Sequence, residues 1–134
     1  MTRGLRQAAI DKAELLVGKD LQKKFLPLEE AAGGKGSTGG QKTDRFEVYG
    51  YYEGAKGVSG DYFDFQPLDD RHVAIINCDV AGKGVPAAMI MVEVATLFLG
   101  WCRDWRRAGA AGGSNGRGRL DALVYTINDM LEER

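Results

Sequence analysis

The chain has 134 residues, of which 44% are hydrophobic and 28% charged, a composition typical of one globular domain. Its formal net charge of −1 argues against nucleic-acid or anionic-membrane partners, which need a basic surface. Cys78 and Cys102 lie in apolar runs, so we expect free thiols rather than a zinc or disulfide framework. The first residues lack the apolar core of a signal peptide, which favours a cytoplasmic location.

Residues 5–26 predict a helix, because they are rich in Ala, Leu, Lys, Gln and Glu and contain no proline before Pro27. This leading helix, within residues 1–27, is expected either to cover a sheet or to end a coiled coil from an upstream module. The irregular spacing of its apolar residues does not decide between these two alternatives.

Residues 31–43 are rich in glycine and predict a flexible surface loop. Residues 36–43 nearly fit the phosphate-binding pattern GxxxxGK[ST], but Gln41 stands where its second glycine is needed. No apolar helix follows, so a bound phosphate would not meet a helix N-terminus. We therefore do not expect nucleotide binding.

Three strand-like segments follow, at residues 44–52, 61–68 and 72–80, and their short connections predict one antiparallel sheet. Helices are expected at residues 85–102 and 120–131, with a basic, glycine-rich loop at 103–118 between them. The apolar run 85–101 is too short for a membrane span and contains Glu93, so we interpret it as a buried core helix. Residues 1–134 thus form one α+β domain or a fragment of one, in which residues 44–134 supply an antiparallel sheet packed with helices.

Two carboxylates, Asp61 and Asp79, lie at the ends of two successive predicted strands. If the intervening turn centres on Asp70, these two residues face each other, where like charges repel. A hard divalent cation such as Mg²⁺ or Mn²⁺ would stabilise the pair, and the Val80 carbonyl is a further candidate ligand. The alternative is that both aspartates merely cap turns.

The glycines at positions 82 and 84 would let the backbone approach such a cation. Asp64 has the opposite strand parity to Asp61 and is interpreted as a supporting residue or a turn cap. His72 is expected on the surface. Ser59 has no partner base in any motif, so nucleophilic catalysis is not predicted.

The same segments resemble a known family. Residues 57–65, GVSGDYFDF, resemble the VGGDYYDFF signature of the SpoIIE/RsbU-type serine phosphatases, the bacterial branch of the PP2C-like (PPM) metal-dependent phosphatases. Residues 78–88, CDVAGKGVPAA, resemble the family's GDVSGKGVPAA signature, and residues 21–27, LQKKFLP, are similar to its helix ending in LLP. The order and spacing fit over roughly residues 5–131, with Ser59 where glycine is usual.

The resemblance implies a partial PP2C-like α/β/β/α sandwich and hydrolysis of phosphoserine or phosphothreonine on a partner protein. Asp61 and Asp79 would be catalytic metal ligands for Mn²⁺ or Mg²⁺, two ions in the complete family site, with Asp79 bridging them. Val80 would contribute its backbone carbonyl, and the supporting residues would be Asp64, Gly82 and Gly84. The usual substrate in the family is a phosphorylated anti-sigma-factor antagonist, a small STAS-type anti-anti-sigma protein.

The family's later motifs, which supply the remaining metal ligands, are not found. Asp121 and Asp129 lie in the last predicted helix and match neither of those motifs. We therefore expect the N-terminal portion of a catalytic domain, carrying part of the metal site and inactive by itself. An apolar sheet face would remain open, which a homodimer would cover. The alternative function is a catalytically incomplete interaction or dimerisation module.

Overall fold

The computed structural model describes residues 2–27, 29–30, 37–53, 58–110 and 118–133. Within these ranges the chain forms three helices and five strands, which confirms the predicted α+β class. The helices are α1 (Arg3–Phe25), α2 (Gly84–Ala110) and α3 (Leu120–Glu132), and the strands are β1 (Glu29–Glu30), β2 (Ser37–Lys42), β3 (Glu47–Tyr52), β4 (Tyr62–Pro67) and β5 (Val73–Cys78).

The described strands form two antiparallel sheets, one in the order β1-β2-β3 and one made of β4 and β5. The predicted single sheet is therefore wrong, because β3 pairs with β2 rather than with β4. The predicted loop at 31–43 is also wrong for its second half, which is strand β2, while residues 31–36 lie outside the described residues. Strand β2 can form despite its glycines because the backbone hydrogen bonds of a sheet need no side chain. The Tyr49 ring packs over Gly40, since it would lie 3.2 Å from a methyl group at that position.

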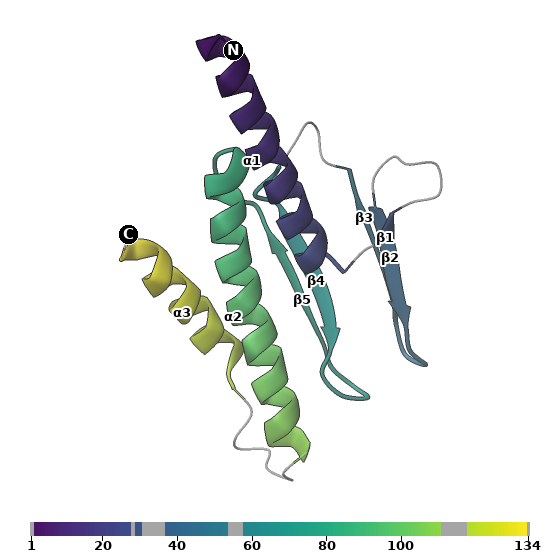
Figure 1. The fold of residues 1–134 in the computed structure, drawn as a ribbon. Helices are drawn as coiled ribbons and strands as arrows, with labels where there is room; N and C mark the ends of the chain where they lie inside the picture. The colour runs from purple at the N-terminus through teal and green to yellow at the C-terminus, as the bar shows by residue number, and fades with distance from the viewer. Residues whose placement is uncertain (1, 28, 31–36, 54–57, 111–117, 134) are drawn as a thin grey trace.

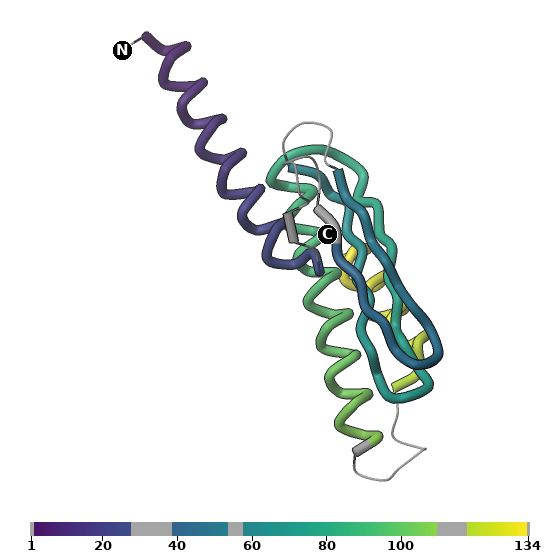
Figure 2. The backbone as a smooth tube through the Cα atoms, turned by 90° about the vertical axis from the view of Figure 1, so that its right-hand side faces the viewer, coloured from purple at the N-terminus to yellow at the C-terminus, as the bar shows by residue number. Residues whose placement is uncertain are grey.

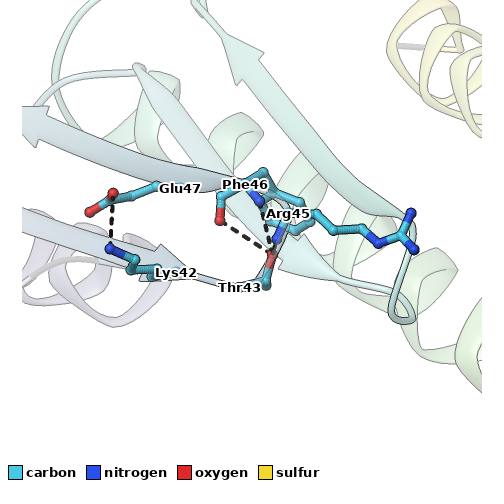
Figure 3. Close-up of polar contacts among 5 residues, drawn as sticks. All are labelled: Lys42, Thr43, Arg45, Phe46 and Glu47. Carbon is cyan, nitrogen blue, oxygen red and sulfur yellow. Dashed lines mark hydrogen bonds and ion pairs between the residues drawn. The ribbon is translucent and has the colours of Figure 1, made fainter.

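Of the residues that nearly fit a phosphate loop, 37–42 form strand β2 and Thr43 begins the turn into β3 (Figure 3). The Thr43 hydroxyl accepts hydrogen bonds from the amides of Arg45 at 3.3 Å and Phe46 at 3.2 Å. The Lys42 ammonium lies 3.7 Å from the Glu47 carboxylate across the strand pair. Lys42 and Thr43 thus have local structural partners, and the chain continues into a strand instead of a helix.

Helices α1 and α2 lie on one side of the strands (Figures 1 and 2). Helix α2 contacts α1, α3, β4 and β5, and so forms the centre of the fold. Its buried residues recur every three or four positions, which is the spacing of one helix face. They include Met91, Ala95, Phe98, Cys102 and Trp105.

Helix α2 continues eight residues beyond its predicted end, through part of the expected loop at 103–118. The extension is held by the turn between β4 and β5. The ring of Trp105 lies 5.3 Å from that of His72, which is exposed as predicted, and Arg106 donates a hydrogen bond to the Pro67 carbonyl at 2.9 Å. These contacts join residues far apart in the chain, and the basic, glycine-rich sequence of 103–118 does not indicate them. The sequence alone therefore favoured a loop.

By length and composition alone, residues 84–109 are long and apolar enough to cross a membrane. The prediction that this helix is too short is therefore wrong. Helix α2 nevertheless packs against both other helices and the β4–β5 sheet, with Met91, Ala95 and Cys102 fully buried. Those contacts are those of a core helix, as the sequence predicted.

Helix α1 has two different halves. Its N-terminal half is exposed and projects past the strands (Figure 2). Its C-terminal half packs on α2, and its buried residues are Gly18 and Gln22. A methyl group at Gly18 would lie 2.3 Å from the Val58 side chain, so glycine lets the helix approach this segment closely.

Candidate metal site

Strands β4 and β5 pair in the register that places Asp61 and Asp79 at the same end of the hairpin. The pairs run from Tyr62 opposite Cys78 to Pro67 opposite Val73, all equidistant from residue 70, as the sequence predicted. Asp61 immediately precedes β4 and Asp79 immediately follows β5. The strand pairing therefore brings the two carboxylate-bearing residues to one edge of the small sheet.

The side chains of Asp61 and Asp79 are both exposed, and the charges of both affect the pKa of the Cys78 thiol. Burial raises the pKa of Cys78, and the negative charges of Asp79 and then Asp61 raise this pKa further. Cys78 and Cys102 are free thiols, as predicted, and burial raises the pKa of Cys102 to about 11.

The two sequence motifs contact each other through Gly60. A methyl group at this position would lie 2.7 Å from the Val80 Cβ and 2.8 Å from the Val80 carbonyl oxygen. The absence of a side chain at Gly60 thus lets this segment approach closely the carbonyl that was predicted as a ligand. The Gly84 amide donates to the Val58 carbonyl at 3.4 Å, which links the same two segments a second time.

Gly82 and Gly84 have φ angles of +112° and +72°, in the region that favours glycine. These two residues turn the chain from the end of β5 into the first residue of α2. The supporting role predicted for both glycines therefore has a conformational basis: they allow a tight exit from the carboxylate-bearing strand end.

Ser59 stands where the family signature has glycine. Its hydroxyl accepts a hydrogen bond from the Asp61 amide at 2.9 Å, closing a small turn. The substitution is thus accommodated by a bond to the backbone of the predicted metal ligand.

Asp64 lies on the opposite face of β4 from Asp61, with 2% of its surface exposed. It accepts hydrogen bonds from the Phe65 amide at 2.7 Å, the Tyr62 hydroxyl at 3.0 Å and the Gln66 side chain at 3.2 Å. Burial raises its pKa, although these three bonds act in the opposite direction. Asp64 therefore supports the hairpin from within the core and does not face the edge where Asp61 and Asp79 lie.

The candidate donor atoms at this edge are hard oxygens, namely two exposed carboxylates and the Val80 carbonyl. Such donors fit Mg²⁺ or Mn²⁺, which often take one or two protein carboxylates and fill the remaining positions with water or phosphate oxygens. Among the residues that the structure describes, no group of three or more His, Cys, Asp or Glu side chains is arranged to hold a metal. The described part of the chain thus offers a two-carboxylate site.

Sequence reasoning missed Gln22 of helix α1. Its side chain is 4% exposed and makes hydrogen bonds to the backbone of Ser59 and Asp61. A single glutamine on an otherwise polar helix gives no strong signal. Its place in the segment 21–27, which resembles a family motif, was the one available indication.

The family model for stage II sporulation protein E (SpoIIE) matches residues 69–134. The match includes Asp79, Val80 and the two glycines of the turn into α2, arranged as described above. Over residues 69–134, just under half of the chain, the sequence is therefore similar to the SpoIIE family. SpoIIE proteins are PP2C-like, metal-dependent phosphatases, so the match supports the predicted family.

A similar known protein is Protein IcfG of Synechocystis sp., which is 33% identical over 82 residues. The aligned region covers 61% of this chain but 11% of Protein IcfG. The chain therefore corresponds to a small part of that relative.

We predict that Gly60→Ala lowers the free energy of unfolding by about 1–3 kcal/mol, because the added methyl group overpacks the contact with Val80. Gly100→Ala is the control: nothing lies within 4 Å of the new methyl group, and alanine inside helix α2 should stabilise by about 0.5–1 kcal/mol. Urea unfolding measures both. A Gly60→Ala variant as stable as the wild type would contradict the contact.

We predict that the stabilities of Asp64→Asn and Asp69→Asn depend on pH in opposite ways. Because the pKa of Asp64 is raised in the folded state, its contribution to stability is fully present below its unfolded pKa and is lost as pH rises through its folded pKa. Asp64→Asn should therefore gain stability relative to wild type as pH rises. The Arg71 amide is the main cause of a lowered pKa at Asp69. Its contribution is present above its unfolded pKa and is lost on acidification through its folded pKa, so Asp69→Asn is the less stable variant at neutral pH.

Urea unfolding from pH 3 to pH 7 measures both differences. If the stability of the two variants changed with pH in the same way, burial would not be the factor that determines the pKa of Asp64.

Proposed function

We propose that the protein carrying this chain is a metal-dependent protein serine/threonine phosphatase of the SpoIIE/RsbU type, in which this chain provides part of the metal site. The observation that carries the proposal is the register of the β4–β5 hairpin, which brings Asp61 and Asp79 to one edge. The match of residues 69–134 to the SpoIIE family model supports the reaction class.

Asp61, Asp79 and the Val80 carbonyl would hold Mn²⁺ or Mg²⁺, with Asp79 as the bridging carboxylate. When bound, the ions supply activation of water and neutralisation of charge on the phosphoryl group. The chain's own contribution is to fix both carboxylates at the strand ends, with the Gly82–Gly84 turn keeping the backbone close to them. Asp64 contributes from the core by holding the hairpin.

The proposed substrate is a phosphorylated STAS-type anti-anti-sigma protein, and the proposed compartment is the cytoplasm. Both follow from the resemblance to the SpoIIE/RsbU-type phosphatases. The net charge of −1 is compatible with a protein substrate and gives no support for a nucleic-acid partner.

We predict that the full-length product of the gene hydrolyses p-nitrophenyl phosphate and a phosphorylated STAS-type protein only when Mn²⁺ or Mg²⁺ is present. Asp79→Ala and Asp61→Ala should each lower turnover by more than about 100-fold, because each removes an oxygen ligand from the site. The control is Asp70→Ala, an exposed change in the turn at the other end of the hairpin.

The 134-residue chain by itself should show no turnover. Turnover by the full-length protein that survives Asp79→Ala, or no turnover with either metal, would contradict the proposal. Turnover by the short chain that disappears in Asp79→Ala would instead show that the site is complete within it.

A second candidate function is an interaction or dimerisation module. A cleft of ≈ 370 Å³ lies between β3 and the β4–β5 hairpin, on the face away from α2. Apolar side chains line it and are largely exposed, namely Tyr49 at 72%, Tyr51 at 55% and Ile75 at 64%. Burial of these side chains against a second copy would remove apolar surface from water.

We predict that this chain forms a dimer in sedimentation equilibrium and that Ile75→Asp dissociates it, because a buried charge at the cleft is unfavourable. Ile10→Asp on α1, 50% exposed and outside the cleft, should leave the dimer intact. A wild-type chain that is monomeric at every concentration, or a dimer insensitive to Ile75→Asp, would contradict this function.

A further inference from the structure

Gln22 is a buried polar side chain on a helix that is mostly exposed. Only 4% of its surface is accessible, and α1 is otherwise buried at Gly18. Burying an amide is unfavourable unless its donors and acceptor are satisfied. The partners of Gln22 therefore explain why this side chain lies inside the protein.

The Gln22 side chain joins α1 to two separate segments. Its Nε2 donates to the Tyr52 hydroxyl at 2.9 Å, the Ser59 carbonyl at 3.1 Å and the Asp61 carbonyl at 3.4 Å. Its Oε1 accepts from the Ser59 amide at 3.3 Å. Both ends of the amide thus contact the segment that leads directly to the Asp61 carboxylate.

The segment 58–61 is held by contacts other than strand pairing. Residues 58–61 precede β4 and are outside the β4–β5 ladder. The Ser59 hydroxyl accepts a hydrogen bond from the Asp61 amide. A Ser59 held in place by Gln22 therefore also restrains Asp61. Gly18, one turn earlier on α1, packs against Val58 and sets how closely the helix approaches.

We propose that Gln22 is a positioning residue of the metal site, whose amide holds the backbone of Ser59 and Asp61 so that the Asp61 carboxylate lies beside Asp79. This inference rests on the proposed function, since it assumes that the two carboxylates share a cation. A glutamine suits the role because one side chain must both donate to carbonyls and accept from an amide. A glutamate of the same size can accept but not donate when ionised.

The experiment measures Mn²⁺ affinity by titration calorimetry and amide hydrogen exchange at Ser59 and Asp61, in the wild type and three variants. Gln22→Ala removes the amide, and Gln22→Glu keeps its size but removes the donor. Tyr52→Phe is the matched control, because it removes one partner of Gln22 and leaves the bonds to Ser59 and Asp61. Melting curves followed by circular dichroism identify a temperature at which all variants are folded, and the titrations are made at that temperature.

Gln22→Ala and Gln22→Glu should lower Mn²⁺ affinity by about tenfold or more, the usual effect of losing a group that orients a metal ligand, and should speed exchange of the Ser59 amide. Tyr52→Phe should keep wild-type affinity even where its melting temperature falls. Folded Gln22 variants with wild-type affinity would overturn the positioning role and leave the proposed function intact. A wild-type chain that binds no Mn²⁺ at millimolar concentration would overturn the positioning role, whereas the proposed function is tested separately by turnover of the full-length protein.

Discussion

The contact between Gly60 and Val80 is the constraint on which the rest of the candidate site depends. These residues are the immediate neighbours of Asp61 and Asp79, and a single methyl group would be too large for the space between them. Because Gly60 and Val80 are in close contact, the two segments that carry the carboxylates lie side by side at this end of the hairpin. The hairpin register alone brings the strand ends together, and the glycine contact then determines how close the two backbones come.

Helix α2 supplies the rigid support for this arrangement. It starts at Gly84, directly after the turn with positive φ angles, so its first residue is connected to the site through the backbone. Its buried face then packs on the hairpin along most of its length, and Arg106 reaches the Pro67 carbonyl near the far turn. The hairpin is thus attached to one helix at both ends, while Asp64 and Tyr62 form a hydrogen-bonded pair in the core between them.

Local patterns predicted those parts of the molecule that depend on neighbours in the sequence. The turn centred on residue 70 gave the hairpin register, and the glycines at 82 and 84 gave the turn into α2. Parts that depend on distant partners were not predictable in the same way. Strand β2 is stabilised by pairing with β3, although its glycine-rich sequence has a low strand propensity.

The same reason explains the extension of α2 and the role of Gln22. The last turns of α2 are stabilised by His72 and Pro67, which lie more than thirty residues earlier in the chain. Gln22 is 37 residues from Ser59, and nothing in its own segment indicates that its side chain is buried. For the candidate site, the sequence predicted both carboxylates and the carbonyl as ligands, but the residue that links α1 to this segment was found only in the three-dimensional structure.

The central claim is that Asp61 and Asp79 share one divalent cation at the end of the β4–β5 hairpin. The most direct test is a titration of the isotope-labelled chain with Mn²⁺, observed as paramagnetic broadening of backbone amide signals. The account predicts that broadening begins at residues 60–62 and 78–80 together, and that Asp61→Asn or Asp79→Asn weakens it at both segments. Broadening at one segment only, or broadening centred on other carboxylates such as Asp121 and Asp129, would contradict the account.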